Sequence, residues 1–398
     1  MASPAARAGA AQDAAQAPTP LDAQLFGDIR FRYEHARDGG RPLDASAATL
    51  RLRAGLEVSL EDGLTGLAEF EGAEAFVDAY DDLIGPPENR AVVADPAFAE
   101  LNRLYVRMSP LKGASITVGR QYLSLDDERF IGRVAFRQND QTLDAVRLEA
   151  ALPLGLDVEA AYIWSVNRIL SDRNPNGRFR GDSAVINASL RTPVGRIAGF
   201  YYALDLETGP RTAPDASASS KTVGVRWEGR SAAFDPAVLR WEGSYARQTE
   251  FADAPLPYAA DYWLGAASAE IGRLTFGGRF ELLGRGGARA FQTPLATLHA
   301  FQGAADVFLT TPSEGVRETA LRIDWRAGEI GPFTSVAAFA SGHQFKDASG
   351  TRLFGREMNA GLKGSFRGVG LAVKVARYEA SSFGEDVRRI WLSAERAF

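Results

Sequence analysis

The residues with the clearest capacity for chemistry are arginines that recur at every second position. Arg30 and Arg32 stand two residues apart, as do Arg51 and Arg53, and only five of the 45 basic residues of the chain are lysines. A guanidinium group is planar, stays charged at any relevant pH and holds a carboxylate or phosphate with two hydrogen bonds. This spacing therefore indicates a surface that meets anions or pairs with carboxylates.

Residue types for nucleophilic or metal chemistry are scarce. The chain has no cysteine and only three histidines, His35, His299 and His343, which are far apart in the sequence. Thiolate catalysis and disulfides are therefore excluded, and a zinc cluster is not expected. Asp126 and Asp127 would point to opposite faces of a strand, and no G-x-S-x-G or H-E-x-x-H motif occurs. We assign no catalytic residue, metal ligand or cofactor and do not expect an enzyme.

Composition by itself describes an ordinary water-soluble protein. The 398 residues are 45% apolar, carry a formal net charge of -5 and have a mean hydropathy of -0.16. No run of about 18 apolar residues occurs, so no membrane-spanning helix is expected. The charge balance argues against a nucleic-acid binder. Only the order of the residues along the chain shows which elements would position the arginines.

Apolar and polar residues alternate strictly over many short segments. Leu25, Ile29 and Phe31 would lie on one face of a strand, and Arg30 and Arg32 on the other. No segment of similar length has a convincing helical period. We count about 18 such segments between residues 25 and 398. The chain is therefore expected to be all-β.

The connections between these segments alternate between short and long. Short connections hold turn residues such as those at 61–63, 110–113 and 193–195. The long connections are expected at residues 37–47, 77–97, 123–141, 169–181, 206–220, 251–259, 284–315 and 341–352. This alternation is typical of an up-and-down meander in which one end carries function and the other end closes hairpins.

The number of strands decides which face points inward. Side chains can fill a barrel of about eight strands, whereas a barrel of about 16–18 strands encloses an open lumen. The apolar face is therefore expected to meet lipid and the charged face to line the lumen. Closure of the sheet into a barrel would give every backbone N–H and C=O group of the strands a hydrogen-bond partner. Residues 21–398 are predicted to form a transmembrane antiparallel β-barrel of about 18 strands (16–18) in the outer membrane of a Gram-negative bacterium.

The charged face permits two interpretations. Arginines in the lumen favour anions, but carboxylates such as Glu34, Glu69 and Glu281 share that face and could pair with them across strands. The pore therefore either prefers anions or has a lining of mixed charge. The candidate lining and substrate-binding residues are Arg30, Arg32, Arg51, Arg53, Arg103, Arg107, Arg120, Arg129, Arg137, Asp144, Arg147, Arg168, Arg279 and Arg322.

Two of the long connections have distinctive sequences. Residues 118–147 read VGRQYLSLDDERFIGRVAFRQNDQTLDAVR, and residues 290–312 read AFQTPLATLHAFQGAADVFLTTP. These segments resemble the alginate-export family of outer-membrane porins. Ala304 stands where a tryptophan is expected in that family. The resemblance implies an 18-stranded barrel with an arginine-rich conduit, but it does not imply that alginate is the solute.

The long connections at 123–141 and 284–315, to which these two segments belong, are expected to narrow the lumen. Arg129, Arg137 and Asp144 have an alternative role, as an ion network that folds a loop into the pore. The candidate residues of the constriction loop are Phe291, Gln292, Thr293, His299 and Asp306.

The two ends of the chain carry further signals. Residues 1–20 contain Ala8-Gly9-Ala10, which fits a cleavage site, so they are expected to be a signal-peptide remnant and flexible leader. A disordered alanine-rich tail is the alternative. Ile390, Leu392 and the terminal Phe398 share one face and resemble the C-terminal signature read by the barrel-assembly machinery.

Together these patterns predict a monomeric outer-membrane porin. It would pass hydrophilic, preferably anionic solutes, such as sugar acids, uronates or other carboxylates, through an arginine-rich lumen, with outer-membrane lipid around it. The alternatives are a soluble or surface β-rich binding protein and a barrel-embedded hydrolase. The patterns name neither the solute nor the direction of transport.

Overall fold

The chain folds into one sheet of 18 antiparallel strands. The computed structural model describes residues 21–60, 63–207 and 218–398, and the expected leader at 1–20 lies outside the described residues. The strands and the two 3₁₀ turns are β1 (Leu21–Asp38), β2 (Ala45–Leu60), β3 (Leu64–Ala79), β4 (Phe98–Leu111), β5 (Ala114–Gln121), β6 (Thr142–Leu152), η1 (Pro153–Gly155), β7 (Leu156–Asn167), β8 (Arg178–Thr192), β9 (Gly195–Leu204), β10 (Ser220–Phe234), β11 (Ala237–Thr249), β12 (Ala259–Ile271), β13 (Leu274–Leu283), η2 (Leu298–Ala300), β14 (Val316–Ile330), β15 (Phe333–Lys346), β16 (Leu353–Phe366), β17 (Val369–Ala380) and β18 (Val387–Ala397). The described residues include no helix that is both long enough and apolar enough to cross a membrane.

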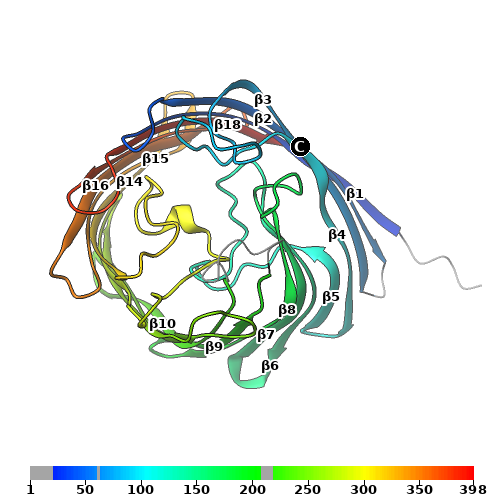
Figure 1. Cartoon of the computed structure of the whole chain (residues 1–398). Helices are drawn as coiled ribbons and strands as arrows, with labels where there is room; N and C mark the ends of the chain where they lie inside the picture. Colours follow the sequence, from blue (N-terminus) through cyan, green and yellow to red (C-terminus); the bar gives the residue numbers. More distant parts are fainter. Residues whose placement is uncertain (1–20, 61–62, 208–217) are drawn as a thin grey trace, which may run out of the picture.

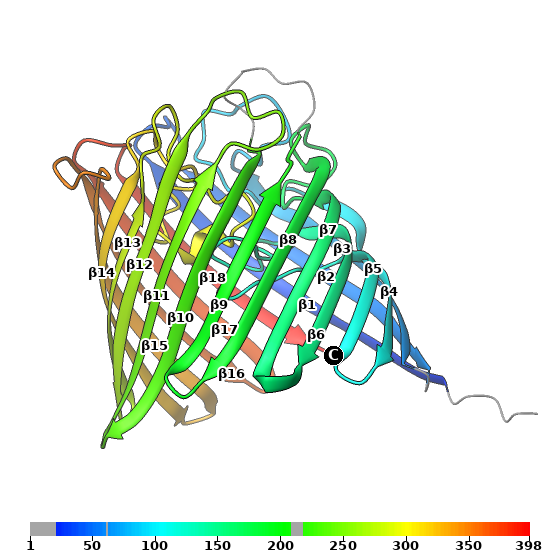
Figure 2. The same cartoon turned by 90° about the horizontal axis from the view of Figure 1, so that it is seen from below.

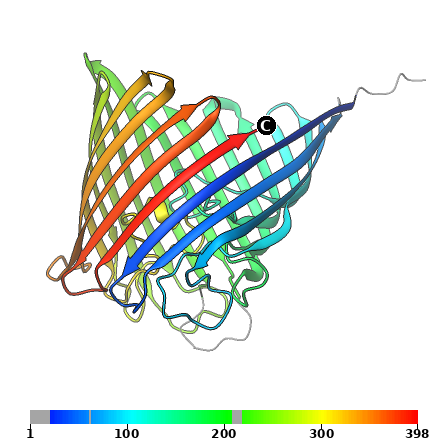
Figure 3. The ribbon, with the colours of Figure 1, turned by 90° about the horizontal axis from the view of Figure 1, so that it is seen from above.

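The sheet closes on itself to form a barrel. Each strand pairs with its neighbours in the sequence, and β18 returns to pair with β1 (Figures 1 and 2). The closing register runs from Asp28 opposite Ala397 to Asp38 opposite Val387, and Figure 3 shows the two strands side by side. Closure leaves no strand edge with unpaired backbone groups, which is required inside a bilayer. The predicted 18-stranded up-and-down barrel is confirmed.

The two faces of each strand differ in polarity as the alternation predicts. On the outer surface, Leu25 is 80% exposed and Leu52 is 52% exposed, whereas Arg30 and Arg51 point inward and are buried. Apolar side chains that stand open on the outside of a barrel are suited to contact with lipid. Composition by itself wrongly indicated a water-soluble protein, because the apolar residues lie on one face of each strand rather than in long runs.

The connections are long at one end of the barrel and short at the other (Figure 2). Seven of the eight expected long connections fall at the long end, and most of the eighth, at 206–220, lies outside the described residues. Residues 381–386 between β17 and β18 form a further long connection. Phe398 lies at the end with short turns, where its backbone exchanges hydrogen bonds of 2.9 and 3.0 Å with Gly27. In barrels of this type, short turns face the periplasm and long loops face the outside.

Two of the long connections turn into the barrel instead of standing above it. They are the first inner loop (residues 122–141) and the second inner loop (residues 284–315), which lie inside the ring of strands in Figure 1. The loops meet where Ile131 forms a parallel bridge with Leu295. The Gly132 N–H donates to the Leu295 carbonyl at 2.9 Å. The two loops therefore form one body inside the lumen.

The largest apolar cluster of the molecule lies beneath this body. Ile131, Phe291 and Leu295 are fully buried, and they pack in one cluster with Leu143 of β6 and Tyr262 of β12. The hydrophobic core thus lies between the inner loops and the wall. The loops fill one part of the barrel with packed side chains and leave the remainder for solutes.

Candidate solute path through the barrel

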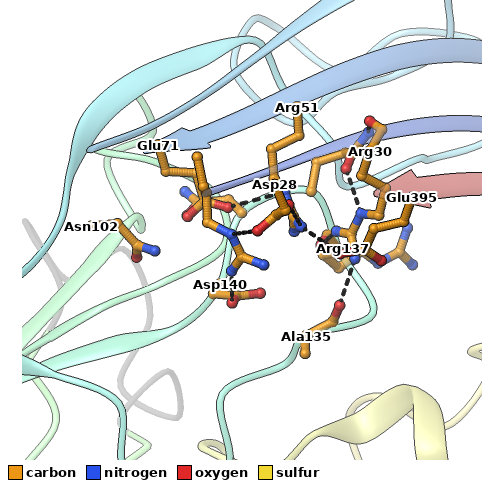
Figure 4. Close-up of polar contacts among 12 residues, drawn as sticks. Asp28, Arg30, Arg51, Glu71, Asn102, Ala135, Arg137, Asp140 and Glu395 are labelled. Atoms are coloured by element: carbon orange, nitrogen blue, oxygen red, sulfur yellow. Dashed lines mark hydrogen bonds and ion pairs between the residues drawn. The ribbon is translucent and has the colours of Figure 1, made fainter. Parts of the chain in front are cut away.

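Arginines of β1 hold the first inner loop against the wall. Arg30 donates through Nε to the Gln138 side chain at 2.9 Å and through Nη1 to the Ala135 carbonyl at 3.0 Å (Figure 4). It also donates to the carbonyl of Arg137, and Arg32 donates to a neighbouring carbonyl of the loop. These bonds satisfy loop carbonyl groups that would otherwise lack partners inside the barrel.

Strand β2 supplies a second pair of anchoring arginines. Arg53 lies 2.7 Å from Asp28 of β1 and 2.7 Å from Asp140 of the first inner loop. Arg51 lies 2.5 Å from Asp28 and 3.1 Å from Glu395 of β18. Figure 4 shows Asp28, Asp140 and Glu395 gathered near Arg51. The network joins the first strands, the last strand and the loop.

This arrangement changes the role expected for four predicted lining residues. Arg30, Arg32, Arg51 and Arg53 do face the lumen, but none is more than 9% exposed because the first inner loop covers them. A passing solute cannot reach them. Their position on the lumen face was predictable from alternation, whereas the loop that covers them was not.

Arg129 joins the two inner loops to the wall from a fully buried position. Its guanidinium group donates to Glu281 of β13 at 2.8 Å, to Thr293 at 2.9 Å and to Gln302 at 3.0 Å. Burial alone would lower the pKa of Arg129, but the Glu281 carboxylate outweighs burial and raises it. Arg129 therefore acts within the ion network that was the alternative prediction for it.

Arg137 makes a similar connection on the opposite side of the first inner loop. It lies 2.8 Å from Asp306 of the second inner loop and 3.3 Å from Glu34 of β1. Arg389 of β18 lies 2.8 Å from the same Glu34. Each inner loop is therefore fixed by charges from the other loop and from the strands.

His299 is held in a single protonation state. Its Nδ1 lies 2.8 Å from Asp306, and its Nε2 lies 2.8 Å from Lys374 Nζ, which can only donate. Nε2 is therefore the acceptor and Nδ1 carries the proton. The ring stacks on Phe136 with 3.4 Å between centroids. Burial lowers the pKa of His299 to about 4, so the ring is neutral at ordinary pH.

The space left open by the loops is a cavity of about 970 Å³ on the side of β9–β17. Its inner border is the segment 299–304 of the second inner loop. Cationic side chains outnumber carboxylates in its lining: the cations are Arg196, Arg230, Arg240, Arg279, Arg322 and Lys374, and the carboxylates are Glu228, Glu242 and Glu318.

Only two of the predicted lining arginines border this cavity. Arg279 lies 3.1 Å from Glu281 and is largely covered, whereas Arg322, at 2.7 Å from Asp324, has a side chain that is 47% exposed. The other four cations, at positions 196, 230, 240 and 374, were not among the candidates. The alternation of β10 and β11 would have placed Arg230 and Arg240 inward, because they continue the polar face of their strands.

The opposite wall has a different charge balance. Arg107 lies 3.4 Å from Glu149, Arg147 lies 3.0 Å from the same carboxylate, and Arg103 lies 2.7 Å from Glu69. A second cavity of about 630 Å³ runs along this wall. Its charged lining residues are Arg107, Lys112, Arg196, Asp126, Glu149, Asp157 and Glu159. The interpretation of mixed charge thus describes this wall, and the cation excess is confined to the other one.

Three predicted lining residues do not line the lumen. Arg120 and Asp144 lie on the outward face of β5 and β6, the face of Val118, where they form an ion pair of 2.7 Å. Arg168 lies in the external loop after β7, where it donates to the Asn176 carbonyl at 2.7 Å. The first error arises because side chains next to a strand end or bulge are easily assigned to the wrong face.

The predicted constriction residues hold the second inner loop together. Phe291 is fully buried, and Gln292 exchanges hydrogen bonds with the backbone of Thr311 at 2.8 and 3.1 Å. The Thr293 hydroxyl accepts a hydrogen bond from Arg129, and Asp306 forms an ion pair with Arg137. Of the five candidates, only His299 borders the open cavity. Four of them therefore shape the constriction from within the loop.

Ser341, His343 and Glu318 form a chain of hydrogen bonds in the cavity wall. Ser341 Oγ lies 2.8 Å from His343 Nε2, and His343 Nδ1 lies 2.6 Å from Glu318. The order matches the hydroxyl, imidazole and carboxylate of many hydrolases. However, Ser341 is paired on both sides, opposite Arg322 and Asn359, so its backbone N–H is used by the sheet. This position therefore lacks the free backbone donors of an oxyanion hole.

Solved structures with the same fold include outer-membrane proteins of Acinetobacter baumannii and Pseudomonas aeruginosa. Acinetobacter baumannii OccAB4 is 14% identical with a TM-score of 0.73, over 96% of this chain and 99% of that chain. Pseudomonas aeruginosa OpdL is 16% identical with a TM-score of 0.69, over 95% and 99%. OpdK of the same organism, solved with vanillate, is 12% identical with a TM-score of 0.69, over 95% and 98%. At these identities the likeness is one of fold.

Comparison at the level of sequence gives the family. No curated protein matches the chain. Residues 20–253, more than half of the sequence, match the alginate export family. The match covers the first inner loop and the anchoring strands β1 and β2. With a closed barrel, an apolar exterior suited to lipid and an open polar cavity inside, this chain is a porin of the Gram-negative outer membrane, and it belongs to the alginate export family.

Proposed function

We propose that this porin passes small hydrophilic solutes and prefers anions, in particular carboxylates such as sugar acids and uronates. The observation that carries the proposal is the lining of the open cavity, in which six cationic side chains face three carboxylates. Cations in the wall of a pore lower the energy of a passing anion and raise that of a cation. The preference comes from the cations of β9–β14 and β17 and not from the covered arginines of β1 and β2.

The register of the wall supports a stepwise path for an anion. Arg230 lies opposite Arg240, and the same row continues through Ser268 and Gly277 to Arg322. The two small residues leave space between the arginines on either side. An anion in that space would meet guanidinium groups from both directions, each able to give two hydrogen bonds.

The size and charge of this space support a small carboxylate as the solute. OpdK, which shares the fold, was solved with vanillate, a small aromatic carboxylate. A similar carboxylate would suit the cation-rich cavity of the present chain, and alginate is not required by any observation. One closed barrel encloses the whole path, so a monomer without a cofactor is sufficient.

Ion selectivity in planar bilayers tests the proposal. The purified chain should give discrete conductance steps, and the reversal potential in a KCl gradient should show preference for chloride. In the variant R230Q/R240Q/R322Q, three cations that line the cavity are neutralised, so the permeability ratio should fall roughly twofold or more. Added uronate or vanillate should compete with chloride in the wild type and less in the variant.

A matched control is R247Q. Arg247 pairs with Asp261 at 3.2 Å on the outer face of β11 and does not line the cavity. Its selectivity should equal that of the wild type. Preference for potassium in the wild type would contradict anion selectivity and leave the porin assignment intact. An unchanged ratio in the triple variant would show that these arginines do not set the preference.

A further inference from the structure

An apolar groove of about 820 Å³ runs over the outer surface of β13–β18. One row of outward residues crosses it from Phe276 through Ile323, Ala340, Ala360 and Val375 to Ile390, each opposite the next. Alanines therefore form the floor, and larger apolar side chains form walls on both sides. A groove of this kind on the lipid-facing surface can hold a hydrocarbon chain.

The groove ends in arginines at the rim with long loops. In the next outward row towards the loops, Arg377 of β17 lies opposite Arg388 of β18, and Arg388 lies opposite Arg37 of β1. Arg377 and Arg388 are part of the groove lining itself. Like charges directly opposite one another destabilise a sheet. Three adjacent arginines are therefore unfavourable unless an anion lies between them.

The carboxylates nearby do not neutralise this row. Glu379 lies 2.6 Å from Arg377, with both side chains 56% exposed, and Asp44 lies 3.9 Å from Arg37, which is 68% exposed. The Arg388 side chain makes no hydrogen bond or ion pair with any residue that the structure describes. A fourth arginine, at position 356 of β16, points outward and lies opposite Glu379 in the strand register. The rim therefore has a surplus of cations that face outward.

We propose that this surface binds a phosphorylated, acylated glycolipid of the outer leaflet. One acyl chain lies in the groove, and a phosphate group is held between Arg377 and Arg388 with Arg37 beside them. Guanidinium groups bind phosphate with two hydrogen bonds each and remain charged in the headgroup region. The long loops face the outside, so the arginine row stands at the level of outer-leaflet headgroups.

A second copy of the chain is a poorer occupant of the same surface. A two-fold contact places the same patch of both chains together, which would set one arginine row against the other. A lipid with a negative headgroup and an apolar tail matches both parts of the surface. This proposal does not depend on which solute passes through the lumen.

Lipid retention measured by native mass spectrometry tests the proposal. The folded barrel in detergent should retain bis-phosphorylated lipid A, and retention should fall about tenfold or more in R377Q/R388Q, since two charged hydrogen-bonding groups are lost. R377K/R388K keeps the charges but loses the planar guanidinium group, so its lipid retention should lie between that of the wild type and that of R377Q/R388Q. The outward-facing R247Q should match the wild type. Conductance in planar bilayers should be the same in all four proteins, which shows that each is folded.

Two further probes separate the parts of the surface. Dephosphorylated lipid A should bind the wild type as weakly as bis-phosphorylated lipid A binds R377Q/R388Q. A340F fills the floor of the groove and should weaken retention although all the arginines remain. Equal retention by the wild type and R377Q/R388Q would overturn the proposal. Equal binding of phosphatidylglycerol, or a dimer in place of a lipid complex, would also overturn it.

Discussion

Arg129 and Arg322 show how the surroundings decide what an arginine does in this barrel. Arg129 is almost fully buried and bonded to three side chains, whereas the Arg322 side chain is 47% exposed and pairs with Asp324. Removal of one partner from a buried ion pair costs about 3–5 kcal/mol, while exposed pairs contribute about 0–1 kcal/mol. Arg129 is therefore a structural residue, and Arg322 is free to meet solutes.

The His299 site makes a prediction about pH. Burial lowers the pKa of His299 to about 4 from 6.5, and unfolding restores the ordinary value. Between these values the unfolded chain binds a proton that the folded chain does not. The contribution of the buried, neutral His299 to the free energy of unfolding is therefore complete above pH 6.5. It is lost as the pH falls towards 4, at up to about 1.4 kcal/mol per pH unit.

Urea unfolding in detergent at pH 7, 5.5 and 4.5 measures this effect. H299F keeps a ring against Phe136 but cannot titrate, so its stability should be lower at pH 7 and should depend less on pH. H35Q is the control, because the His35 side chain is 38% exposed, and it should keep the wild-type slope. Parallel pH profiles for H299F and the wild type would show that this histidine is not the group responsible.

At the level of elements, the first inner loop (residues 122–141) divides the lumen. Every strand pairs with neighbours on both sides without it, since β5 and β6 are joined by their own ladder from Ala114 to Gln121. The loop adds the contacts with β1, β2 and the second inner loop. It therefore determines the width and charge of the path rather than the existence of the barrel.

Replacement of residues 124–140 by a short glycine-serine linker tests this role. The barrel should still fold and resist denaturant in detergent, because its ladders are intact. Conductance should rise about twofold or more, since a wider lumen replaces a constriction, and selectivity should change because Arg30, Arg32, Arg51 and Arg53 become exposed to the solution.

A substitution in the external loop 347–352 is a suitable control. R352Q removes an exposed pair with Glu314 and the contact of the guanidinium group with the Phe354 ring, and it should leave conductance unchanged. If the loop deletion conducts like the wild type, the narrowest part of the path lies elsewhere in the barrel.

At the level of the whole molecule, closure between β1 and β18 completes the wall. Phe398 continues this pairing through backbone bonds of 2.9 and 3.0 Å to Gly27. A Cβ atom at Gly27 would lie 2.8 Å from the Phe398 ring and 2.5 Å from the Arg53 carbonyl, so glycine is needed at that position. The last residue of the chain therefore takes part in the seam.

F398A is expected to reduce assembly in the outer membrane. The change removes the ring that lies beside Gly27, where the end of β18 meets β1. Heat-modifiable mobility of the protein from outer membranes would report the folded fraction, which should fall several-fold, with F398Y close to the wild type. Equal folded fractions for F398A and the wild type would contradict a role for the terminal aromatic residue.

The barrel could be predicted from the sequence because its signals are local. A period of two residues can be read within about ten residues of any position, and the lengths of the connections can be read along the chain without any contact between distant residues. The inner loops depend on contacts between distant residues, such as Arg30 with Gln138 and Arg129 with Glu281. Arg120 was assigned to the wrong face because a shift of one residue reverses a strand. The burial of lumen arginines is therefore visible only in three dimensions.

The ion pairs between the first and last strands have a consequence for the order of assembly. Arg51 contacts Glu395, 344 residues away, and Arg389 contacts Glu34, 355 residues away. These pairs can form only after the last strand has reached the first. Glu34 also pairs with Arg137 of the first inner loop, and Arg389 also donates to the Ala305 carbonyl of the second inner loop. The ion network around the inner loops is therefore complete only when the wall of the barrel has closed.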